Sequence, residues 1–92
     1  MRYMLCRNRV RDYRTWREVF DSHAAVQREA GMRVVHIWRA VDEPNNVFFL
    51  FEIDDIEAVH AFMSEPAAAQ GRTDAGVVDG EYHFLESGGE VP

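Results

Sequence analysis

The 92-residue chain has a single cysteine, three prolines and no long apolar run, and these scarcities exclude several classes of protein. One cysteine, Cys6, cannot form an internal disulfide, which is typical of a protein in the reducing cytoplasm. No apolar run reaches the length that a membrane-spanning helix needs. The first residues also lack the apolar stretch of a secretory signal peptide. We therefore expect a cytoplasmic protein that neither crosses nor enters a membrane.

Basic residues are also scarce relative to acidic ones, and the formal net charge is −6. This balance argues against nucleic acid or an anionic membrane as the partner. The apolar share of 47% is typical of a globular protein. We expect one domain over residues 1–86, followed by a loose polar tail over 87–92. A domain this short buries a modest core, so pairing with a second copy would stabilise it.

One hairpin over residues 32–54 dominates the pattern. Two runs rich in Val, Ile, Phe and Trp, over residues 34–41 and 47–53, flank a turn that contains Pro44, Asn45 and Asn46. Such runs favour β-strands, and Pro and Asn favour the bend between them. The second run has almost no polar residue, which predicts a strand covered on both faces.

The register of this hairpin decides which side chains share a face. If Val41 pairs with Val47, then Trp38 lies opposite Leu50 and His36 lies opposite Glu52. These residues share one face with Ala40 and Phe48. The other face is almost wholly apolar, and a slip of one residue would exchange the faces of one strand. Its members are Val35, Ile37, Arg39, Val41, Val47, Phe49, Phe51 and Ile53.

The remaining elements complete the order β-α-β-β-α-β. Asp12 is a good N-cap for a helix that runs to about Ala30, where Gly31 favours a left-handed cap. Asp54 with Glu57 resembles a capping box before a second helix. The other expected elements are a strand over Tyr3–Arg9, the second helix over Asp55–Ser64, a short helix over Pro66–Gln70 closed by Gly71, and a strand over Glu81–Glu86.

This order is typical of an α+β, ferredoxin-like domain with a four-stranded antiparallel sheet in the order 4-1-3-2. Two helices cover one face of such a sheet. The face with Val35, Ile37, Val47, Phe49 and Phe51 is too apolar to leave in water. We therefore expect a second copy of the chain to cover it and form a homodimer.

Several stretches resemble the dimeric α+β-barrel superfamily, and within it the antibiotic-biosynthesis-monooxygenase-like group and small proteins labelled cyclases. The resemblance implies a dimeric barrel with a pocket between sheet and helices. The superfamily includes cofactor-independent quinone-forming oxygenases, haem-degrading enzymes, isomerases and dehalogenases. The stretches that carry the resemblance are Val10–Trp16, Phe20–His23, Ala30–Gly31, Asp42–Val47, Phe51–Asp55 and Ala61–Ser64.

Asn8 could match an asparagine of the haem-degrading members, but these also use a histidine after the second helix. The stretch Ser64–Val77 contains no histidine, which argues against a haem role.

The pocket implied by the resemblance could gather a general base and aromatic walls. A histidine beside a carboxylate makes a usable base, and aromatic walls suit a flat polycyclic molecule. The candidate catalytic residues are His23, His36 and Glu52, and the candidate substrate-binding residues are Asn8, Trp16, Trp38 and Phe48. This predicts a cofactor-independent monooxygenase or cyclase-like enzyme acting on an aromatic, polyketide-like molecule. The alternative is a satisfied polar pair in the core of a non-catalytic ligand-binding or structural homodimer.

A metal site is not favoured. The four histidines fall on four different elements and form no closely spaced pair. Glu57 and His60 have the helical spacing of a carboxylate metal site, but such sites need a second motif of the same kind. Cys6 has no visible activating partner and is expected to be structural. We therefore expect no metal and no cofactor.

Overall fold

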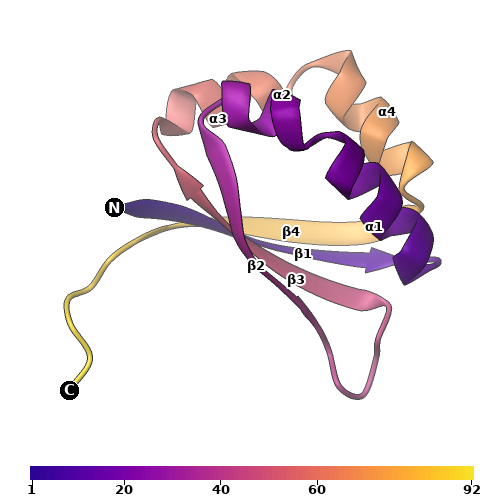
Figure 1. Ribbon diagram of the computed structural model, residues 1–92, viewed down its shortest axis with the longest axis horizontal. Helices are drawn as coiled ribbons and strands as arrows, with labels where there is room; N and C mark the ends of the chain where they lie inside the picture. The colour runs from indigo at the N-terminus through magenta and orange to yellow at the C-terminus, as the bar shows by residue number, and fades with distance from the viewer.

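The computed structural model describes residues 1–92 and shows one antiparallel sheet with four helices on one of its faces (Figure 1). The strands lie in the order β2-β3-β1-β4, which is the predicted 4-1-3-2 order read from the other edge. The ferredoxin-like α+β fold is therefore confirmed. The elements are β1 (Arg2–Val10), α1 (Tyr13–Ser22), α2 (Ala24–Glu29), β2 (Met32–Arg39), β3 (Asn46–Ile53), α3 (Ile56–Met63), α4 (Pro66–Asp74) and β4 (Val77–Glu86).

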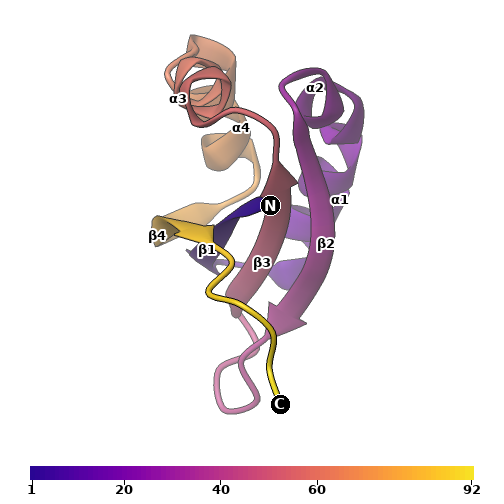
Figure 2. The ribbon, with the colours of Figure 1, turned by 90° about the vertical axis from the view of Figure 1, so that its left-hand side faces the viewer.

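The helices form two groups over the sheet. Figure 2 shows α1 and α2 over the β2 and β3 side, and α3 and α4 toward the β4 side. Residues 87–92 lack regular secondary structure and are exposed. None of the helices combines the length and the apolar character that crossing a membrane requires.

Two of the predicted helix caps are confirmed, and the cap of α3 is displaced by one residue. The Asp12 carboxylate accepts the Thr15 N–H at 3.0 Å, and Gly31 has a positive φ of 76°. Asp55, and not Asp54, caps α3 by accepting the Glu57 N–H at 3.0 Å. The predicted capping box is therefore wrong by one residue, because the Asp54 carboxylate pairs with a guanidinium of β2 instead.

Three predicted boundaries also differ. The first helix divides into α1 and α2 at His23, which has a φ of −96° and a ψ of 4°. Helix α4 continues through Gly71 to Asp74, and the left-handed turn comes at Gly76, with a φ of 73°. Strand β4 begins at Val77, before the predicted start, because acidic residues of this stretch pair with arginines across β1.

The predicted register of the hairpin is wrong by two residues. Trp38 lies opposite Phe48, and His36 lies opposite Leu50, because the turn takes up more of the chain than we expected. A bulge between Val34 and His36 then shifts the rest of β2. Glu52 lies opposite Arg33 on β2 and Tyr3 on β1. A shift of two residues keeps the alternation of faces, so His36 and Glu52 share a face without pairing.

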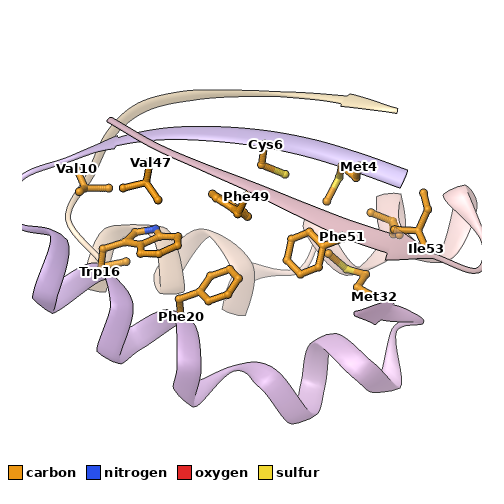
Figure 3. Packing of buried hydrophobic residues seen from close by; sticks show 12 residues of the cluster. Met4, Cys6, Val10, Trp16, Phe20, Met32, Val47, Phe49, Phe51 and Ile53 are labelled. Atoms are coloured by element: carbon orange, nitrogen blue, oxygen red, sulfur yellow. The ribbon is translucent and has the colours of Figure 1, made fainter. Parts of the chain in front are cut away.

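The assignment of the two sheet faces is also wrong. The alternate β3 residues Val47, Phe49, Phe51 and Ile53 point toward the helices and are buried (Figure 3). Trp16 and Phe20 of α1 cover the middle of this row, and Ile53 lies near Met32 at its end. The Phe49 ring centroid lies 5.3 Å from that of Trp16 and 5.2 Å from that of Phe20. The face that we expected a second copy to cover is thus the helix-covered core.

The opposite side of the sheet, which no helix covers, is called the open face below. Its centre is apolar and consists of Tyr3 and Leu5 on β1 with Phe48 and Leu50 on β3, all half-buried. Trp38 on β2 is 45% exposed and Leu85 on β4 is 43% exposed. His36 stacks on Trp38 with a centroid distance of 4.7 Å.

Two neighbouring phenylalanines provide a test of this assignment. We expect Phe49→Asp to abolish cooperative folding, because it removes an aromatic core contact worth about 3–5 kcal/mol and buries a carboxylate. Phe48→Asp places the same charge on the open face, so the monomer should keep its far-ultraviolet circular dichroism spectrum. Thermal unfolding followed by circular dichroism distinguishes them. Equal melting temperatures for both variants would contradict the assignment.

Candidate functional site

A cavity of about 850 Å³ lies between the helices and the sheet. This volume is in the usual range for sites that bind small organic molecules. Its lining includes exposed residues of α4 and β4, Arg72 and Tyr82, so the cavity opens to solvent at that side. The remaining wall is largely apolar and includes Met4, Cys6, Trp16, Phe20, Phe49, Phe51, Phe62 and Met63.

The structure brings three of the predicted site residues together at this cavity. Asn8 comes from β1, Trp16 from α1, and His23 from the junction of α1 and α2. His36, Trp38, Phe48 and Glu52 lie on the open face instead, because that face turns away from the helices. The expected meeting of His36 and Glu52 inside the pocket is therefore wrong. Trp16, Phe20 and Phe49 form the aromatic wall.

The position of His23 depends on the break between α1 and α2 and on the absence of a side chain at Gly71. It ends α1 and begins α2, which aims its side chain toward α4. A Cβ added to Gly71 of α4 would lie 2.7 Å from the His23 Cε1 atom. Only glycine therefore lets the ring lie against α4 in this position. Neither ring nitrogen has a hydrogen-bond or ion-pair partner in the protein, so no protein group competes with solvent or a ligand for either of them.

Sequence reasoning missed two polar residues of the cavity. Gln27 lies on α2, one turn after His23, and only 8% of its surface is exposed. The four-residue spacing from His23 was the available signal, since such residues share a helix face. His60 on α3 lines the cavity from the other side and contacts the Phe84 ring edge-on at 5.1 Å. Its side chain is also exposed to solvent.

The charges of the cavity are few. Burial raises the pKa of the Cys6 thiol to about 12, so the group is neutral and acts as a small apolar side chain. No three histidine, cysteine or acidic side chains converge in a way that could hold a metal ion. The charged residues of the lining are Arg72, Asp79 and Glu81, and both acids pair with arginines of β1. The rest of the site offers imidazole and amide groups within an apolar wall.

A second hollow of about 490 Å³ lies beside the hairpin turn. It is lined by Arg9 and Val10, residues 42–45 of the turn, and Val78. It contains no histidine and only two hydrophobic residues, so it lacks the aromatic wall that a flat ligand needs.

Comparisons with known proteins agree on the fold. SnoaB, a cofactor-independent oxygenase from Streptomyces nogalater, aligns with a TM-score of 0.75 and 19% identity over 99% of this chain and 96% of its own. The fold is that of the antibiotic-biosynthesis-monooxygenase-like proteins.

Two further structures are named as antibiotic biosynthesis monooxygenases. The one from Bordetella bronchiseptica has a TM-score of 0.78 and 10% identity over 94% of this chain and 95% of its own. The one from Deinococcus radiodurans has a TM-score of 0.69 and 15% identity over 100% and 97%. No family model and no curated protein matches the sequence.

Gly71→Ala tests how His23 is positioned. The new methyl group meets the far end of a side chain that can turn away, and alanine favours the helix by about 1 kcal/mol over glycine. We therefore expect the melting temperature to hold or rise while the His23 ring leaves its position. Histidine side-chain NMR signals would report the movement. Ala69→Gly, at an exposed position of α4, controls for helix propensity. If the His23 NMR signal were the same in Gly71→Ala as in wild-type protein, the close contact between the His23 ring and Gly71 would be contradicted.

Proposed function

We propose that the chain is a cofactor-independent monooxygenase or a cyclase-like enzyme that binds a flat hydroxylated aromatic molecule in the cavity. The observation that carries the proposal is the combination of an aromatic wall with a histidine that has no protein partner. A planar ring would stack against Trp16 and Phe20, and its hydroxyl group would reach His23. The described neighbours, among them a cofactor-independent oxygenase, support the same class of chemistry.

In this proposal His23 is the general base. It takes the proton of a phenolic hydroxyl group, and the resulting anion is electron-rich at the ring carbon para to the oxygen. Molecular oxygen accepts electrons from that carbon and bonds to it as a peroxide anion, which takes the proton held by His23 and becomes a hydroperoxide. The neutral His23 then removes the ring hydrogen as a proton while the O–O bond breaks and hydroxide leaves. The hydroxide takes that proton from His23, so one oxygen atom is in the quinone and the other is in water.

The apolar wall has a second role in this scheme. It shields the anion from water on the side away from the opening, which favours transfer of electrons to oxygen, itself apolar, over protonation by solvent. A cyclase-like reaction would begin with the same removal of an acidic proton. It would then continue by bond formation within the substrate.

A non-catalytic ligand-binding homodimer is the second candidate, and one observation favours it. Neither His23 nor His60 has a carboxylate partner that would fix its tautomer and raise its basicity. The carboxylate expected for this purpose, Glu52, lies on the open face. The two candidates share the cavity and differ in turnover.

Ligand binding and oxygen uptake together separate these candidates. At ten times its dissociation constant, a ligand such as 1-naphthol should raise the melting temperature by about 5–10 °C. A saturated analogue, decahydro-1-naphthol, is the control for shape. Dissolved oxygen should fall with wild-type protein, and His23→Gln should slow uptake by about 10²-fold or more while binding remains. A thermal shift without oxygen uptake would support the binding protein, and no shift would reject both.

The open face is the surface on which we propose a homodimer. Its centre is apolar and its β4 margin carries ion pairs, such as Arg7 with Glu81 at 3.0 Å between Nε and Oε1. An apolar centre with a polar rim is the usual anatomy of a protein interface. His36, Trp38, Phe48 and Glu52 would then belong to the interface, and two sheets would pack face to face.

Light scattering tests this assembly. We expect the mass of a dimer at micromolar concentration, and Leu50→Arg should reduce it to that of a monomer because the guanidinium would be buried without a partner. Val26→Arg makes the same change at an exposed apolar residue of α2 and should leave the dimer intact. A monomeric wild-type mass would contradict the proposal.

A further inference from the structure

We propose that Gln27 is a specificity-determining residue of the cavity, whose side-chain amide binds a second oxygen atom of the ligand. The inference rests on the proposed function, because it concerns the same cavity. It adds a requirement that the proposed function does not contain: the ligand must carry an oxygen beyond the one that meets His23.

The first support is the state of the Gln27 side chain. The residue is 92% buried, the one polar residue among the buried set, and its amide makes no hydrogen bond within the protein. Every side-chain nitrogen or oxygen atom that is fully buried in this molecule has a hydrogen-bond partner. The Gln27 amide therefore keeps some contact with open space. Because Gln27 lines the cavity, we infer that this contact is with the cavity.

The second support is the spacing from His23. The Gln27 N–H donates to the His23 carbonyl at 3.0 Å, so the two residues are one helical turn apart. Residues at this spacing have Cβ atoms about 5–6 Å apart. Two oxygen substituents separated by an aromatic ring span a comparable distance. One planar molecule could thus place a hydroxyl at His23 and a second oxygen at Gln27.

The third support is the energetic asymmetry of a buried amide. A carbonyl oxygen of the ligand would accept from the amide Nε2, and a hydroxyl group would donate to its Oε1. A ligand with only hydrocarbon at this point would displace water and leave the amide unpaired in an apolar wall. Sites that offer a buried polar partner reject analogues that lack the matching group more strongly than apolar pockets do.

Two probes and one substitution test the inference. The probes are 1-naphthol, with one oxygen, and 1,5-dihydroxynaphthalene, with a second oxygen on the far ring. We expect wild-type protein to bind the diol at least about 10-fold more tightly. Gln27→Met keeps the length of the side chain without the amide and should bind both probes equally. Gln70→Met, on the exposed face of α4, is the matched control and should keep the wild-type preference.

The ligand-free protein gives an independent readout. Because the Gln27 amide has no protein partner, Gln27→Met should keep or raise the melting temperature. A fall of more than about 5 °C in both Gln27→Met and Gln27→Leu would show a structural amide and overturn the inference.

Two binding outcomes separate this inference from the proposed function. Equal binding of both probes by wild-type protein overturns the role of Gln27 while the cavity remains an aromatic-binding site. Failure of both probes to bind overturns the proposed function and, with it, the specificity that rests on it.

Discussion

The packing of Trp16 and Phe20 against Phe49 and Phe51 is the contact on which the rest of the structure depends. It selects the face of the sheet that the helices cover, and it anchors α1 over β3. With α1 held there, α4 lies across from it and borders β4. The cavity is lined by residues of both helices and of β1. The core and the candidate site therefore share one aromatic wall.

Much of the fold could be predicted because its signals are local. Asp12 offers a carboxylate where α1 needs a hydrogen-bond acceptor, and Gly31 supplies a positive φ where the chain must turn. The strand order follows from the connections between strands. The choice of sheet face is not local in this sense. Strand β3 is apolar on both sides, so alternation alone could not show which side meets the helices.

The candidate site was less predictable because it depends on contacts between distant elements. Gly71 was expected to end a helix, but its role is to admit the His23 ring from another helix. The sequence does not distinguish a glycine that lets another side chain approach the backbone from a glycine that forms a turn. The same holds for Gln27, since a glutamine one turn after a histidine becomes informative only when both are seen to line the same cavity.

The position of the His23 ring is fixed by packing and not by an ion pair. A histidine held by a carboxylate has its tautomer fixed by that partner, whereas His23 is held by the shape of α4 at Gly71. In the proposed complex, the ligand oxygen that meets His23 would set its tautomer. The aromatic wall would fix only the plane of the ligand, and the buried amide of Gln27 would fix its rotation within that plane. An enzyme of this kind would select its ligand through the Gln27 amide and through the absence of a side chain at Gly71.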